Sequence, residues 1–132
     1  MNKTSRVLSQ VAATAIVLGG TLGFAGPASG ATHSTAHRVY CRSNHHGAYV
    51  CFQPYGDHLF VKDTAKDGYS AAAYWETSYG SRGVCLNKNG AGTVVDCNYK
   101  MHNNWTIRFW AVDVNLPTNT YRYWSAERAA TI

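Results

Sequence analysis

The chain has 132 residues and a formal net charge of +5, with 14% charged and 13% aromatic residues. This length allows one small domain, with or without a targeting segment before it. The low content of charge and the high content of aromatic residues argue against a disordered tail and against a polybasic nucleic-acid binder. The composition is typical of a small domain with a packed core.

The first part of the chain has the pattern of a secretory signal peptide. Lys3 and Arg6 precede an uncharged run, Val11–Ala25, and small residues follow as far as Ala31. The run is too short and too rich in glycine for a retained membrane span, which needs about 20 mainly apolar residues. We therefore expect residues 1–31 to be a signal peptide, cleaved after Ala31 or one residue earlier, and the protein to be secreted and extracellular, without stable membrane insertion.

After the expected signal peptide we expect a polar arm (residues 32–38), followed by a single domain (residues 39–132). The arm has no apolar period, so we expect it to be flexible. Loss of Lys3 and Arg6 lowers the net charge from +5 to +3, and the remaining basic residues are scattered singly. This pattern is typical of a solvated surface, and we expect no nucleic-acid partner.

The four cysteines all fall in the expected domain, and an even number in an exported chain indicates two disulfides. Three pairings are formally open. The spacing favours Cys41 with Cys51 and Cys85 with Cys97, because each pair brackets a short segment with turn residues at its centre. Each disulfide is therefore expected to cross-link a hairpin near its base.

Two segments carry residue types that bind metals, but neither matches a metal motif. Cys41, His45, His46 and Cys51 lie close together without a zinc spacing, and exported thiols tend to oxidise. The segment Asp63–Gly68 lacks the ligand pattern of a calcium loop. We expect no metal and no cofactor.

Short runs rich in Val, Tyr, Phe and Trp recur between clusters of Gly, Asn and Asp, and no helical period is sustained. This pattern predicts an all-β domain, a small β-sandwich of about eight short antiparallel strands. The expected strands are Val39–Arg42, Ala48–Phe52, His58–Asp63, Ala71–Thr77, Gly83–Leu86, Thr93–Asn98, Thr106–Val114 and Thr120–Ala126. In the third strand, Leu59 and Val61 share the face that we expect to be buried.

A faint internal repeat runs through the expected domain, in the order Cys, Gly turn, Cys, Asp, Tyr-Trp. The first copy ends at Tyr74-Trp75 and the second at Tyr123-Trp124. Two similar four-stranded halves would explain the repeat, and chance similarity is the competing explanation.

No catalytic motif stands out. Asp57 directly precedes the expected strand that begins at His58, so we expect the two side chains to point to opposite faces, and no nucleophile motif accompanies them. The spacing selects no acid–base pair among the candidate carboxylates, which are Asp63, Glu76, Asp96 and Asp113. We therefore expect a protein that is not an enzyme.

The surplus of aromatic residues is the strongest functional signal. In one expected strand the alternation places Arg108 and Trp110 on one face, and in the last strand it places Arg122 and Trp124 on one face. Arginine beside tryptophan on an outward face is typical of a binding surface, so these four residues are the candidate binding site. In the alternative interpretation the rings close the core or cap its end by cation–π packing.

Several short motifs resemble those of a protein family. They are Gly56–Asp63 (GDHLFVKD), Asp67-Gly68, Cys85, Gly90, Gly92-Thr93 and Asp96–Tyr99 (DCNY). Within the span Tyr40–Asp113 they resemble the small secreted, disulfide-bonded β-proteins of filamentous actinobacteria, most of which are uncharacterised. In size, export signal and paired cysteines the chain is also similar to the adaptor subunit of secreted umbrella toxin particles, which links a lectin-bearing subunit to a large toxin stalk.

The resemblance implies partner binding rather than chemistry. We expect a secreted binding module that engages another extracellular protein, and in the finer version the adaptor subunit of a toxin assembly. Two alternatives stay open. One is a carbohydrate- or cell-wall-binding module with Trp110 and Trp124 as sugar platforms, and the other is a protease inhibitor that presents the loop Asn44–Gly47 or Asn87–Gly92.

Overall fold

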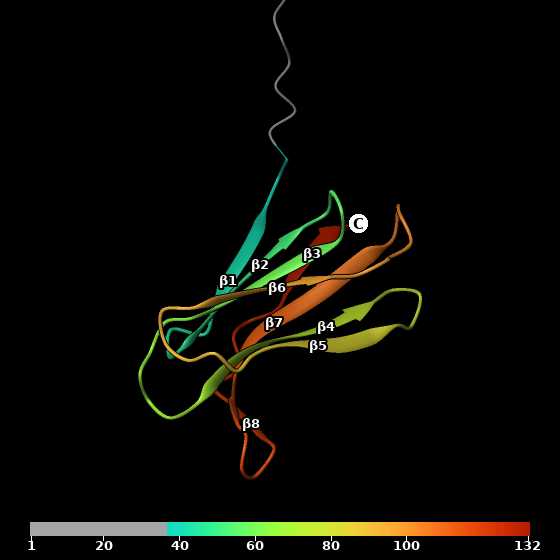
Figure 1. The fold of residues 1–132 in the computed structure, drawn as a ribbon. Helices are drawn as coiled ribbons and strands as arrows, with labels where there is room; N and C mark the ends of the chain where they lie inside the picture. Colours follow the sequence, from blue (N-terminus) through green and yellow to red (C-terminus); the bar gives the residue numbers. More distant parts are fainter. Residues whose placement is uncertain (1–36) are drawn as a thin grey trace, which may run out of the picture. The chain divides into compact units, whose positions relative to one another are not determined.

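The computed structural model describes residues 37–132 (Figure 1). The expected signal peptide (residues 1–31) and most of the expected arm (residues 32–38) lie outside the described residues. Within residues 37–132 there is no helix, and the strands are β1 (Tyr40–Ser43), β2 (Ala48–Gln53), β3 (His58–Asp63), β4 (Ser70–Thr77), β5 (Arg82–Asn87), β6 (Val94–Asn98), β7 (Thr106–Asn115), β8 (Thr120–Arg122) and β9 (Arg128–Thr131).

The strands form two antiparallel sheets that enclose one core between them (Figure 1). The first sheet has the order β1-β2-β3-β6, and the second has the order β5-β4-β7-β8. Strand β7 is long enough to pair with two short strands along one edge, with β9 over Thr106–Phe109 and with β8 over Asp113–Asn115. The predicted all-β sandwich is confirmed.

The first seven strands begin and end within one residue of the predicted bounds. The predicted last strand, Thr120–Ala126, differs because it ends at Arg122, where Tyr123 adopts a left-handed backbone with φ of 53°. A ninth strand, Arg128–Thr131, was not predicted. Its sequence, Arg-Ala-Ala-Thr, has little β propensity, and the strand forms because β7 offers an open edge.

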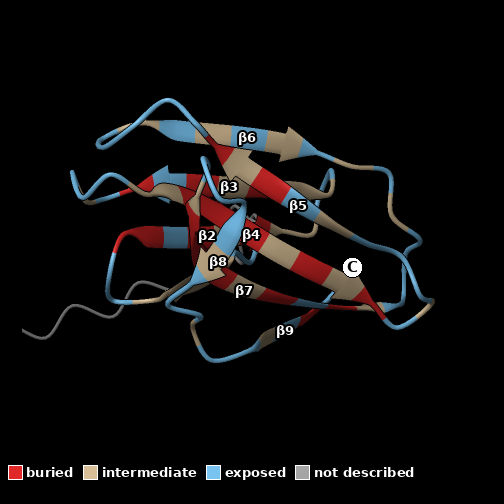
Figure 2. Cartoon of the chain, turned by 90° about the horizontal axis from the view of Figure 1, so that it is seen from below, coloured by how far each residue is buried: buried red, intermediate tan, exposed pale blue. Residues whose placement is uncertain are grey.

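Alternating residues of both sheets build the core, which Figure 2 shows as buried bands along the strands. On β3, Leu59 and Val61 are fully buried and Lys62 is exposed, as the sequence predicts. The inner faces meet where Phe52 of the first sheet packs against Phe109 of the second, with ring centroids 6.2 Å apart. These buried rings hold the two sheets at a fixed separation.

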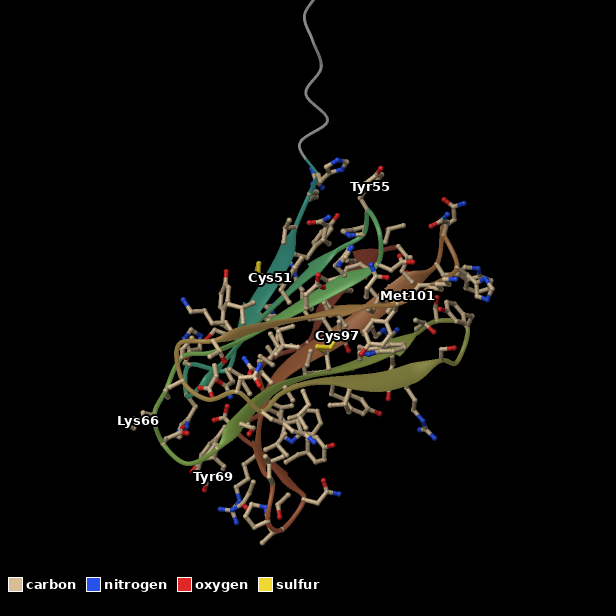
Figure 3. The ribbon with its side chains drawn as sticks, in the orientation of Figure 1. Cys51, Tyr55, Lys66, Tyr69, Cys97 and Met101 are labelled. Carbon is tan, nitrogen blue, oxygen red and sulfur yellow. A yellow bond between two sulfur atoms is a disulfide. The ribbon has the colours of Figure 1, made fainter. Side chains whose placement is uncertain are left out.

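The two disulfides pair as predicted but differ in position. Cys41 and Cys51 are cross-strand partners in the β1–β2 hairpin, with Cα atoms 4.1 Å apart. Cys85 and Cys97 have Cα atoms 5.9 Å apart and join β5 of the second sheet to β6 of the first (Figure 3). The expectation of a second hairpin is therefore wrong, because β5 pairs with β4 and β6 pairs with β3.

The halves of the chain also differ in how they supply strands. The first half supplies β1, β2 and β3 to one sheet, whereas in the second half only β6 joins that sheet. One disulfide lies within a sheet and the other links the sheets. The fold therefore does not repeat the order of motifs seen in the sequence.

A buried asparagine adds a polar tie between the sheets. Asn87, at the end of β5, donates from its side-chain amide to the carbonyl oxygens of Val61 and Thr93, each at 3.0 Å. Its amide oxygen accepts from the backbone N–H of Asn89 at 3.0 Å. Because Asn87 is fully buried, these hydrogen bonds replace those that its side chain makes to water in the unfolded chain.

Candidate functional site

The face of the second sheet that points away from the core carries a separate apolar cluster. Its base consists of three buried residues: Ala72, Val112 and Val114. The rings of Trp110 and Trp124 lie against Tyr74, with centroid distances of 5.8 and 5.6 Å. We call the partly exposed residues over this base the outer patch, and they are Tyr74, Leu86, Trp110, Tyr121 and Trp124.

Strand register explains how the patch forms. Tyr74 on β4 lies directly beside Trp110 on β7. Two residues further along β4, on the same face, Glu76 lies between Arg82 of β5 and Arg108 of β7. The aromatic pair Tyr74 and Trp110 is thus followed along the strands by three residues of alternating charge. These three residues form a charged border beside the apolar patch.

Three of the four candidate binding residues lie on this face. Trp110 is half-buried within the patch, and Trp124 is 48% exposed. The side chain of Arg108 is 60% exposed and lies 3.8 Å from a carboxylate oxygen of Glu127. The structure therefore brings together the arginine and the two tryptophans that the sequence selected.

Arg122 is the exception. It is the cross-strand partner of Asp113, which places it on the opposite face from Tyr121. The left-handed backbone at Tyr123 ends the strand and breaks the alternation, so Trp124 packs against Tyr121 with ring centroids 6.0 Å apart. The expectation that Arg122 and Trp124 share a face is wrong for this reason.

Tyr74 supplies a polar group at the centre of the patch. Its hydroxyl donates a hydrogen bond of 2.8 Å to Oε1 of Glu76. This bond to the carboxylate raises the pKa of Tyr74 above its usual value, because ionisation of the phenol would remove the donated proton. Tyr74 therefore stays a neutral hydrogen-bond donor over a wide pH range.

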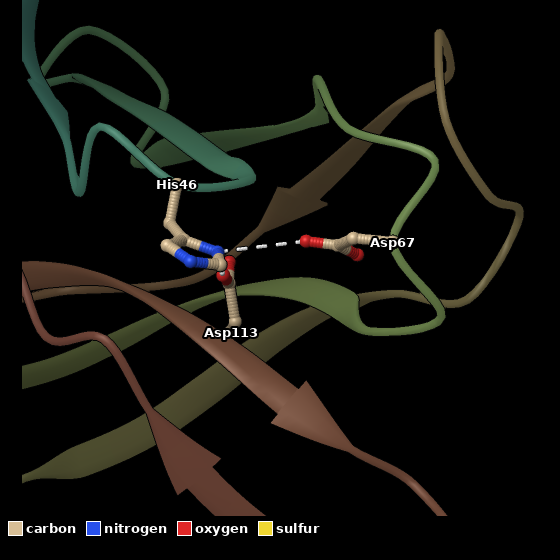
Figure 4. Close-up of side chains that lie close together, drawn as sticks. All are labelled: His46, Asp67 and Asp113. Atoms are coloured by element: carbon tan, nitrogen blue, oxygen red, sulfur yellow. Dashed lines mark ion pairs between the residues drawn. The ribbon is translucent and has the colours of Figure 1, made fainter.

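A second group of polar residues joins three separate segments at one end of the sandwich. Figure 4 shows the imidazole of His46, from the β1–β2 turn, facing Asp67 of the β3–β4 loop and Asp113 of β7. Nδ1 of His46 lies 3.2 Å from Oδ2 of Asp113 and 3.6 Å from Oδ2 of Asp67. We call these three residues the His46 cluster.

Asp113 is the buried member of this cluster. Its side chain is 1% exposed, and its Oδ1 accepts a hydrogen bond of 2.9 Å from the Asn44 amide. Burial raises the pKa of the Asp113 carboxyl above its usual value, because the charged form loses solvation. Keeping Asp113 charged in the folded protein therefore costs some of the free energy of folding.

The sequence named the members of the His46 cluster one by one but did not group them. The set Cys41, His45, His46 and Cys51 is not a metal site, because its two cysteines form a disulfide. Asp67 accepts a hydrogen bond from the backbone N–H of Tyr69, as in a turn rather than a calcium loop. No sequence spacing relates these residues, since three different segments supply the cluster.

His58 forms a different ion pair from the one considered in the sequence. Its Nδ1 lies 2.8 Å from Oδ1 of Asp96, on the neighbouring strand β6, and its Nε2 lies 2.9 Å from the amide nitrogen of Asn98. Asp57 instead accepts a hydrogen bond from the backbone N–H of Met101. The partner of His58 thus comes from strand pairing and not from its chain neighbour.

The fold and these two sites define a small, disulfide-braced, all-β sandwich with an aromatic outer face. No protein-family model, curated protein or solved structure matches the chain. Among residues 37–132, no helix is long and apolar enough to cross a membrane.

Proposed function

We propose that the chain is a secreted, non-enzymatic binding module that engages another extracellular protein through the outer patch. The observation that carries this proposal is the set of partly exposed rings on one face of the second sheet, bordered by Glu76, Arg82 and Arg108. An aromatic centre with a charged border is typical of protein interfaces. The rigid sheet below the patch limits the conformational entropy lost on binding.

The orientation of the rings favours a protein partner over a glycan. The Tyr74 ring stands at 51° to the indole of Trp110 and at 71° to that of Trp124. A sugar platform needs an open, flat ring face, whereas the Tyr74 ring is tilted against Trp110 and edge-on to Trp124. An uneven surface of this kind suits the side chains of a protein.

The extracellular setting and the adaptor role are the finer parts of the proposal. Two disulfides are consistent with an oxidising environment. The expected export signal and the paired cysteines resemble those of the adaptor subunit of umbrella toxin particles. In this version, the outer patch would hold one subunit of an exported assembly.

Purification of the protein from the medium of the cells that produce it tests the proposal. We expect a complex heavier than the monomer, and we expect Trp124→Ala to weaken it by about 30-fold or more, as for a central aromatic contact. Trp105→Ala is the matched control. Trp105 is 47% exposed, close to the value for Trp124, but it packs against Tyr79 outside the patch.

Four results would contradict the proposal. The first is a protein that remains a monomer under gentle conditions, and the second is an equal loss of complex in the Trp124→Ala and Trp105→Ala variants. The third is retention on chitin, cellulose or cell-wall polysaccharide that disappears with Trp124→Ala, which would favour the glycan alternative. Inhibition of a protease that leaves the loop Asn44–Gly47 or Asn87–Gly92 uncut would favour the inhibitor alternative.

A further inference from the structure

The two aspartates of the His46 cluster are oriented by hydrogen bonds that a simple ion pair with His46 would not need. Each aspartate uses its Oδ1 for a hydrogen bond to the surrounding protein, Asp113 with the amide of Asn44 and Asp67 with the backbone N–H of Tyr69, both at 2.9 Å. The Oδ2 atoms of both aspartates face Nδ1 of His46 (Figure 4). Hydrogen bonds that orient one oxygen and leave the other directed inward are typical of carboxylates that bind a metal ion.

The buried oxygen of Asp113 is the observation that points to a ligand. The Asp113 side chain is only 1% exposed, and its Oδ2 accepts no hydrogen bond from the described residues, because Nδ1 of His46 lies 3.2 Å away without hydrogen-bond geometry. A buried carboxylate oxygen without a partner is costly, and structures rarely retain one without a compensating charge. The oxygen points toward the space between His46 and Asp67, where a cation would supply that charge.

The surroundings hold the imidazole in place and bring its turn close to both carboxylates. The His46 ring stacks on Tyr123 with centroids 3.6 Å apart and an angle of 7° between the planes. At Gly47, a Cβ atom would lie 3.2 Å from carboxylate oxygens of both Asp67 and Asp113. Glycine therefore allows the turn to approach the two carboxylates closely.

We propose that His46, Asp67 and Asp113 bind a divalent first-row transition-metal ion of the Zn²⁺ type. Ligands about 2.0–2.1 Å from a tetrahedral zinc ion lie roughly 3.3 Å from one another. The separations of 3.2 and 3.6 Å from Nδ1 of His46 are close to that value, and all three ligand atoms lie within 4.8 Å of one another.

The donor set selects the class of ion. An imidazole nitrogen with two carboxylate oxygens suits zinc and its neighbours, whereas calcium and magnesium prefer oxygen ligands alone. Three protein ligands leave at least one coordination position for water. The ion would tie the β1–β2 turn and the β3–β4 loop to β7, so its effect on the fold is separate from partner binding by the outer patch.

Metal binding by the purified, untagged full chain tests this proposal. After treatment with a chelator, we expect ZnCl₂ to bind in a 1:1 ratio by calorimetry and to raise the midpoint of thermal unfolding, while MgCl₂ and CaCl₂ leave it unchanged. Asp67→Asn and His46→Gln should each weaken zinc binding by about tenfold or more. Asp67 is exposed, so Asp67→Asn keeps the fold even if changes at the buried Asp113 do not.

His58→Gln is the matched control. His58 also lies beside a carboxylate, Asp96, but its other neighbour is the amide of Asn98, so the pair lacks a second carboxylate. We expect its zinc affinity to equal that of the wild type. The proposal is overturned if zinc neither binds nor stabilises the wild type, or if Asp67→Asn and His46→Gln bind zinc as tightly as the wild type. Equal losses in the His58→Gln variant would overturn it as well.

Discussion

The two disulfides close loops of similar length, but we expect their removal to have different effects on stability. Cys41–Cys51 and Cys85–Cys97 have sequence separations of 10 and 12. In the chain-entropy model, a disulfide that closes a loop of this size stabilises the folded state by about 3 kcal/mol, because it lowers the conformational entropy of the unfolded chain. This contribution is nearly equal for the two bridges, so any large difference must come from the folded state.

The folded state distinguishes the bridges. Cys85 is fully buried between the sheets, whereas Cys41 and Cys51 are only partly buried and are already held together by the β1–β2 register. Replacing Cys85 and the partly buried Cys97 by alanine removes the buried sulfur of Cys85 and leaves a cavity, at a cost of about 1–2 kcal/mol beyond the loop term. We therefore expect a loss of about 4–5 kcal/mol for this pair and about 3 kcal/mol for Cys41→Ala/Cys51→Ala.

Urea unfolding followed by tryptophan fluorescence measures both losses as differences in the free energy of unfolding. Each double variant keeps the other disulfide, so each serves as the control for the other. Equal destabilisation of the two variants, or greater destabilisation of Cys41→Ala/Cys51→Ala, would refute the view that the second bridge is a packed part of the core.

Two further predictions concern the second sheet. Gly83 lies opposite Trp75, and a Cβ at Gly83 would lie 2.7 Å from the buried indole. We expect Gly83→Ala to cost about 1–3 kcal/mol in urea unfolding, and a smaller cost in a Trp75→Leu background; the same cost in both backgrounds would exclude the indole as the cause. At the outer patch, we expect Glu76→Gln to lower the pKa of Tyr74 toward its usual value, because the negative charge that accepts the hydrogen bond from the phenol is gone. NMR titration of the Tyr74 ring, assigned with Tyr74→Phe, measures this change, and an unaltered pKa would contradict it.

The sequence alone determined the local features of the fold. The bounds of the first seven strands and the buried face of β3 follow from alternating apolar residues between turn residues. The pairing of the four cysteines follows from short spacings, because cysteines that are close in the chain meet at low entropic cost. The pairing Arg108–Trp110 on one face also follows from alternation within a single strand.

Tertiary structure decided the features that depend on which strands become neighbours. Only the sheet order shows that the Cys85–Cys97 bridge joins two sheets and that β9 completes the edge of β7. The left-handed backbone of Tyr123 places Trp124 on a different face from Arg122. The alternation of side chains along a strand does not predict where the strand ends in this way. The His46 cluster draws its three members from segments that are distant in the chain, so side-chain chemistry could name them but only packing could bring them together.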